Sequence, residues 1–93
     1  MPTIELVSRL RTGTTEQKRE ALTALDPIAS LEDFRLVIEA LSDDHWVVRR
    51  HACDRLVTIG APLLDRLAEA LSTANDDQQY WIMQAMVSVG RAA

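Results

Sequence analysis

Two histidines and one cysteine are the side chains in this sequence best suited to acid–base, metal or nucleophilic chemistry. His45 and His51 are six residues apart, so on a helix they fall on different faces and cannot share a metal ion without distortion. Cys53 has no histidine at helical contact spacing, and its position predicts burial, which disfavours a reactive thiolate. The sequence contains no Gly-rich phosphate loop, no Gly-x-Ser-x-Gly elbow and no His-Glu-x-x-His motif. We therefore predict no catalytic site, no metal site and no cofactor.

Length and composition predict one small helical domain, residues 1–93. The chain is 47% hydrophobic but only 4% aromatic, and its apolar residues are mainly Leu, Ala, Val and Ile, which suits helix packing better than a sheet sandwich. A net charge of −4 argues against a dedicated nucleic-acid binder and against binding to anionic membrane surfaces. The single cysteine excludes an internal disulfide, and the N-terminal residues lack the apolar run of a secretion signal. These features predict a cytoplasmic protein.

Glycines, prolines and capping residues divide the chain into six predicted helices. Gly60 and Gly90 each follow a long periodic segment, where a helix commonly ends on a left-handed residue. The predicted helices are residues 3–11, 16–25, 31–41, the segment after Asp44 up to Ile59, 62–71 and 77–89. The predicted N-caps are Thr14 or Thr15 for the second helix, Ser30 with Asp33 in a box-like pair for the third, Asp43-Asp44 for the fourth, and Asn75 or Asp76 for the sixth.

The chain repeats itself with a period of about 30 residues. At an offset of 31, Leu10, Ala21 and Leu25 align with Leu41, Ala52 and Leu56; at an offset of 30, Leu56, Ile59 and Gly60 align with Met86, Val89 and Gly90. Each unit is one short helix, a polar turn and a second helix. This gives three units, residues 2–25, 27–60 and 61–90.

The middle unit carries a family signature: Leu41-Ser42-Asp43-Asp44, Val48-Arg49, Ala52, Leu56, Ile59-Gly60-Ala61-Pro62, Leu67 and Leu71. This pattern resembles the HEAT-like repeat family, including the bacterial form named after phycobilisome lyases. The resemblance implies an all-α fold, a short right-handed α-solenoid of three helical hairpins. It also implies a structural link between units through Asp43 and Arg49. Only the middle unit has both residues, because the other two units carry Thr12 with Lys18 and Thr73 with Gln79 at these places.

In HEAT-like stacks the second helix of each unit lines a concave binding face. By position, the resemblance predicts that face to be formed by Arg19, Arg50, His51, Asp54, Tyr80, Trp81 and Gln84. Trp81 falls on what should be the polar side of its helix, and exposed aromatics beside Arg are typical of protein-binding hot spots. The alternative is that the last helix rotates and buries Trp81. Trp46, which opens the fourth helix, is predicted to be structural and to pack over the neighbouring turn.

The C-terminal end of the stack is the second candidate surface. Trp46, Cys53 and Val57 should contact the next unit, and the matching residues of the last unit are Met83 and Val87, with Tyr80 beside them. A terminal repeat should present a polar cap, and this end is apolar. We expect it to be covered by a second copy in a homodimer, by a partner protein, or by further repeats.

The function predicted from these features is a non-catalytic protein–protein interaction module or small scaffold. Two alternatives stay open: an accessory subunit of a tetrapyrrole (bilin) lyase, implied by resemblance alone, and a HEAT-like nucleic-acid binder of the alkylpurine glycosylase kind. The acidic balance of the chain disfavours the second. Other HEAT-like proteins hold a di-iron site with His-Glu dipeptides, which this sequence lacks, so that activity is not implied.

Overall fold

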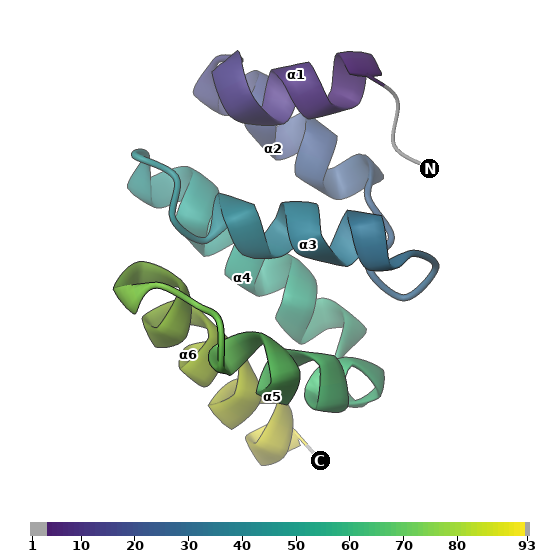
Figure 1. Ribbon diagram of the computed structural model, residues 1–93, viewed down its shortest axis with the longest axis vertical. Coiled ribbons are helices and arrows are strands. Elements are labelled where there is room, and N and C mark those ends of the chain that lie inside the picture. Colours follow the sequence, from purple (N-terminus) through teal and green to yellow (C-terminus); the bar gives the residue numbers. More distant parts are fainter. Residues whose placement is uncertain (1–3, 93) are drawn as a thin grey trace.

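The computed structural model describes residues 4–92, which form six α-helices in three antiparallel hairpins (Figure 1). The helices are α1 (Ile4–Thr12), α2 (Thr15–Ala24), α3 (Leu31–Ala40), α4 (Trp46–Ile59), α5 (Leu64–Leu71) and α6 (Asp76–Ala92), with a 3₁₀ turn at Ala61–Leu63 before α5. The predicted all-α repeat fold is confirmed. The predicted start of the first helix at Thr3 lies outside the described residues.

The six helices form two layers (Figure 1). The first helices of the repeats, α1, α3 and α5, form one layer, and the second helices, α2, α4 and α6, form the other. Helix α4 packs against both α2 and α6, whereas the first helices make few contacts with one another. Closer packing in the second layer makes it the inner side of the stack, so side chains that point away from the core on α2, α4 and α6 share one face.

Three helix N-termini are capped as the sequence predicts. The Thr14 hydroxyl accepts from the Gln17 N–H at 3.2 Å and the Gln17 side chain accepts from the Thr14 N–H, which completes a capping box at α2. Asn75 and Gln78 make the same reciprocal pair at α6, with bonds of 2.8 and 3.0 Å. The Ser30 hydroxyl accepts two backbone N–H groups at the start of α3.

Two predicted details at helix starts are wrong. Asp33 does not return a bond to Ser30; its carboxylate instead accepts from the Asp26 N–H at 3.2 Å, because the chain folds back over α3 after α2. The N-cap of α4 is His45 and not an aspartate. The Asp43 carboxylate accepts from the His45 N–H at 2.9 Å and so shapes the turn that leads into α4.

The glycines have different roles. Gly60 ends α4 with φ of +79°, a conformation that L side chains rarely adopt, as the sequence predicts. Gly13 is needed for space, because a Cβ there would lie 2.5 Å from the Arg9 carbonyl oxygen. The prediction that Gly90 ends the last helix is wrong, since α6 continues through it to Ala92.

One continuous apolar core runs between the two layers. Val48, Ala52 and Leu56 of α4 are fully buried at its centre, and Ile82 and Val89 continue this stripe on α6. Both sets recur at helical spacing, so each lies on one face of its helix. Within residues 4–92, no helix has the length and apolar content needed to cross a membrane.

Candidate functional site

A groove of about 630 Å³ runs between α4 and α6 on the inner face of the stack. Three aromatic rings define it. The Trp46 and Trp81 rings meet edge to face with centroids 6.5 Å apart, and Trp81 and Tyr80 do the same at 5.1 Å. The Arg50 guanidinium lies over the Trp46 ring, 5.8 Å from its centroid. The groove therefore presents a connected aromatic cluster, Trp46–Trp81–Tyr80, with a cation stacked at one end.

The exposure of the cluster is the unusual feature. Trp46 is 55% exposed and Tyr80 is 56% exposed, while Trp81 is half-buried and packs against the core. The structure thus places Trp81 between the two alternatives left by the sequence, with part of its ring in the core and part in the groove. Trp46 does contact the next repeat, through Trp81, but more than half of its surface stays open to solvent.

The charged residues of the groove are balanced. Arg50 pairs with Asp54 one turn later on α4, with a 3.5 Å contact at the exposed rim. Arg49 donates to the Asp43 carbonyl oxygen at 2.8 Å, and Asp77 supplies a second acidic group at the α6 side. The remaining predicted residue on this wall, Gln84, is exposed. A groove with equal numbers of opposite charges offers anchoring points for either sign but no cationic track for a phosphate backbone.

Arg19 and His51 lie next to this groove and not inside it. They line a smaller hollow of about 120 Å³ between α2 and α4, which shares Trp46 and Arg50 with the larger groove. His51 Nε2 lies 3.1 Å from the Thr23 hydroxyl. Burial, followed by the positive charge of Arg19, holds the pKa of His51 below its ordinary value. The imidazole is therefore kept neutral and bridges α2 and α4.

Cys53 lies beneath the groove, in surroundings that disfavour a reactive thiolate. Its thiol is buried and makes a weak 3.7 Å contact with the Trp81 carbonyl oxygen. Burial, with a smaller contribution from the Asp54 charge, raises the pKa of the Cys53 thiol to about 11. The thiolate needed for nucleophilic attack is thus scarce at neutral pH. Among residues 4–92, no three His, Cys, Asp or Glu side chains lie close enough together to hold a metal ion.

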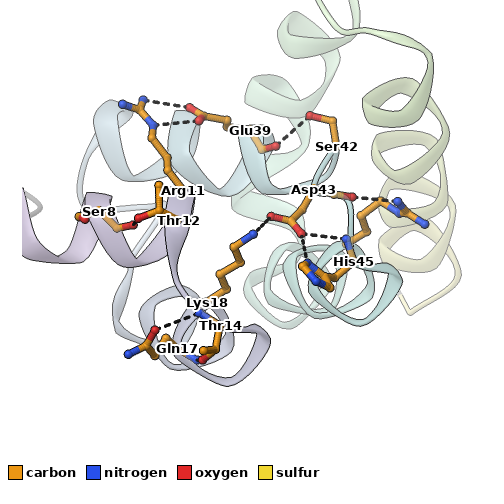
Figure 2. A network of polar contacts seen from close by, with 11 residues as sticks. Ser8, Arg11, Thr12, Thr14, Gln17, Lys18, Glu39, Ser42, Asp43 and His45 are labelled. Atoms are coloured by element: carbon orange, nitrogen blue, oxygen red, sulfur yellow. Dashed lines mark hydrogen bonds and ion pairs between the residues drawn. The ribbon is translucent and has the colours of Figure 1, made fainter.

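The link between the first two repeats differs from the one that the family pattern implies (Figure 2). Asp43 accepts from Lys18 Nζ at 2.6 Å, whereas Arg49 binds only the Asp43 backbone carbonyl. Both side chains of the ion pair are about nine-tenths buried. Burial opposes ionisation of Asp43, but hydrogen bonds from Lys18 and from the His45 backbone and ring outweigh it, so the pKa of Asp43 lies below its usual value.

Lys18 is the residue that sequence reasoning missed. The repeat alignment could have indicated its role, because Lys18 aligns with Arg49 at the repeat offset of 31 and keeps the positive charge of that position. A second inter-repeat pair lies nearby, where the Arg11 guanidinium grips both carboxylate oxygens of Glu39 at 3.0 and 3.2 Å (Figure 2). This pair is exposed, so it contributes little to stability beside the buried Lys18–Asp43 pair.

Comparison with known proteins gives one match. The family model for HEAT repeats matches residues 4–87, which covers five helices and most of α6. No curated protein and no solved structure matches the chain significantly.

Proposed function

The chain belongs to the HEAT repeat family, and from that premise we propose that it is a non-catalytic interaction module that binds a partner protein in the α4–α6 groove. HEAT repeats are commonly protein–protein interaction modules and are generally non-catalytic. The observation that carries the proposal is the exposed cluster of Trp46, Trp81 and Tyr80 with Arg50 stacked on it. A cytoplasmic location is part of the same proposal, and the single cysteine supports it.

The residue types of this cluster are those that dominate binding energy at protein interfaces. Trp, Tyr and Arg are enriched at hot spots. Trp and Tyr remove a large area from water and lose few rotatable bonds on binding, and Arg adds a charged planar group that stacks on aromatic rings and donates several hydrogen bonds. The edge-to-face contacts among the rings hold them in place before a partner arrives, which lowers the entropic cost of binding. The partner that fits is a protein segment with an apolar anchor for the groove, flanked by charged groups that reach Arg50 and Asp54 or Asp77.

The open end of the stack forms the second part of the proposal. Tyr80, Met83 and Val87 are exposed on the outer face of α6, and a covering partner there would remove them from water. The alternative of a nucleic-acid binder gains no support from the groove, because Arg50 pairs with Asp54 and the groove has no net positive charge. The family match gives no support to a bilin-lyase subunit.

The test is selection of ligands from a displayed peptide library, followed by titration of the selected peptides against variants. Trp46→Ala and Tyr80→Ala should each weaken binding by tenfold or more, because hot-spot truncation costs about 2 kcal/mol or more. Leu31→Ala is the matched control, since Leu31 is an equally exposed apolar residue on α3, outside the groove, and should leave binding unchanged. A library that yields no ligand, or ligands that bind both groove variants as tightly as the wild type, would contradict the proposal.

A further inference from the structure

The outer face of α6 carries a row of side chains with apolar residues at its centre and opposite charges at its ends. The row follows helical spacing and consists of Asp76, Tyr80, Met83, Val87 and Arg91. Met83 is 56% exposed and Val87 is 51% exposed, although both are apolar. Their side chains point away from the buried row of α6, which includes Ile82, Ala85 and Val89.

The repeat register identifies this row as a packing face. At the offset of 30, Met83 and Val87 correspond to Cys53 and Val57 of α4. In the middle repeat these two residues lie at the contact between α4 and α6; Cys53 is buried and Val57 is half-buried against the core. The equivalent face of α6 has the same chemistry and no neighbour among the described residues. It is therefore suited to another helix rather than to solvent.

The opposite end of the stack matches that row less well. A shallow hollow between α1 and α2 is lined by three charged residues, Glu5, Arg9 and Glu20, beside three apolar ones, Leu6, Ala21 and Ala24, and Arg9 pairs with Glu5 at 2.7 Å. A head-to-tail contact would press the apolar row of α6 against these solvated charges and leave them poorly hydrated. A two-fold contact, in which α6 of one copy packs on α6 of another, avoids that cost.

We propose that α6 pairs with α6 of a second copy of this chain, antiparallel, about a two-fold axis between Met83 and Gln84. Residues equally distant from that axis then face each other across the pair. Tyr80 of one copy meets Val87 of the other, Met83 lies beside the axis, and Asp76 faces Arg91. Tyr80 thus meets an apolar group, Met83 meets Gln84 of the other copy beside the axis, and each acid meets a base, so the row is complementary to itself in this register.

Two further observations support the antiparallel arrangement. Neither Asp76 nor Arg91 has an ion pair within residues 4–92, so both charges are available to a second copy. Antiparallel pairing also places the N-terminal end of each α6, with its acidic residues, beside the basic C-terminal end of the other, which suits the helix dipoles. The pairing of α6 rests on the proposal for the open end, and it shares two residues with the groove, Tyr80 and Gln84.

The first measurement is the solution mass by light scattering and by sedimentation over a wide range of protein concentration. The wild type should approach twice the chain mass of 10.4 kDa. Met83→Glu combined with Val87→Glu should stay at the chain mass and keep the helical circular dichroism spectrum of the wild type, since both residues are exposed in one chain. A monomeric wild type, a dimer that survives this double change, or an open-ended polymer would each overturn the proposal.

A charge exchange tests the register. Asp76→Arg and Arg91→Asp should each, on its own, weaken the dimer on the order of tenfold, because both symmetry-related pairs become repulsive. An equimolar mixture of the two variants should dimerise again, because each mixed dimer restores two opposite-charge pairs. If the mixture associates no better than either variant alone, the antiparallel register is wrong.

The outcomes separate this proposal from the groove proposal. Trp46→Ala should lose peptide binding and keep the dimer mass, whereas the Met83→Glu and Val87→Glu double variant should lose the dimer and keep peptide binding, because neither Met83 nor Val87 lines the groove. A monomeric wild type that still binds peptides would contradict only the pairing of α6. A dimeric wild type that binds no peptide in the groove would contradict only the groove proposal.

Discussion

The two junctions between repeats use the same layer of helices but different chemistry. At the first junction, α2 and α4 are joined by polar contacts that satisfy one another inside the fold. At the second junction, α4 and α6 are joined by aromatic and apolar contacts, part of which remain open as the groove. We call the first junction closed because its Lys18–Asp43 pair is about nine-tenths buried, and the second junction open because the groove of about 630 Å³ lies there.

The first junction is held by buried and part-buried polar contacts. Lys18 reaches Asp43 inside the fold, and the Arg55 guanidinium donates to the carbonyl oxygens of Leu22 and Leu25 at the end of α2. The Leu22 carbonyl also accepts from the Leu25 N–H at the C-cap of α2, so Arg55 adds a second donor at this helix end and complements the helix dipole. The contacts of Lys18 and Arg55 each cross from one repeat to the next.

Within residues 4–92, the second junction has two comparable polar contacts between side chain and backbone, besides the weak thiol contact of Cys53. The Arg66 guanidinium of α5 donates to the Pro27 carbonyl oxygen at 2.6 Å. Gln78 of α6 donates to the Ile38 carbonyl oxygen of α3 at 3.3 Å. The remaining contact is made by the rings of Trp46 and Trp81 above the buried Cys53. A junction built this way can leave side chains exposed without leaving buried polar groups unpaired, which is what a binding groove needs.

The largest expected effect tests the closed junction. Lys18→Met should lower the free energy of unfolding by about 3–5 kcal/mol, because it leaves the buried carboxylate of Asp43 without its cation. A domain of this kind has a total stability of only about 5–15 kcal/mol, so the variant should be close to unfolding in mild denaturant. Urea denaturation followed by circular dichroism measures the change.

A double variant separates the charge from the packing. Lys18→Met with Asp43→Asn should recover part of the loss, because the uncompensated charge is gone while the bond to the His45 N–H can remain. If Lys18→Met alone costs no more than an exposed substitution, the Lys18–Asp43 pair is not what closes this junction.

The next effect concerns the open junction. Trp81→Ala should lower the free energy of unfolding by about 2 kcal/mol, less than a fully buried Trp would cost, because only part of its ring lies in the core. Trp46→Ala should cost less than Trp81→Ala, since more than half of Trp46 is exposed. A double-mutant cycle should give a coupling of about 0.5–1.5 kcal/mol for the edge-to-face pair. Zero coupling would mean that the two rings do not hold each other in the groove.

A smaller, pH-dependent effect returns to the closed junction. The pKa of His51 is lowered first by burial and then by Arg19, with Arg55 acting in the same direction and Asp54 against it. The unfolded chain then binds a proton more readily than the folded one below the ordinary histidine pKa of about 6.5. The free energy of unfolding should therefore fall as pH decreases from about 7.5 to about 5.5, and His51→Gln should flatten that slope. A slope that His51→Gln leaves unchanged would assign the titration to another group.

Much of this architecture is readable from the sequence, for identifiable reasons. The 30-residue period and the capping residues placed all six helices, with α3 and α4 each within a residue or two of the observed ends. Core positions such as Ala52 and Leu56 were also predictable, because burial on a helix follows its own spacing. Local patterns therefore determine both the elements and the face that each element buries.

Contacts between elements were less predictable. Lys18 looked like a departure from the repeat pattern, and its burial depends on how closely the turn before α4 approaches α2, 25 residues away. The meeting of Trp46 with Trp81 likewise depends on the angle between α4 and α6, which no single segment encodes. The family pattern indicated that repeats would be linked here, but the side chains that make each link follow from packing in three dimensions.

The smallest effect compares two glycines at equivalent positions in the second and third repeats. Gly90 lies inside α6 with open space around its Cα, so Gly90→Ala should raise the free energy of unfolding by about 0.5 kcal/mol by reducing the freedom of the unfolded chain. Gly60→Ala should act in the opposite direction by about 1 kcal/mol or more, because φ of +79° strains any L side chain. Denaturation of both variants measures the difference. If Gly90→Ala also destabilises the fold, Gly90 ends the helix as Gly60 does, and the last turn of α6, which carries Arg91 toward a second copy, is not helical.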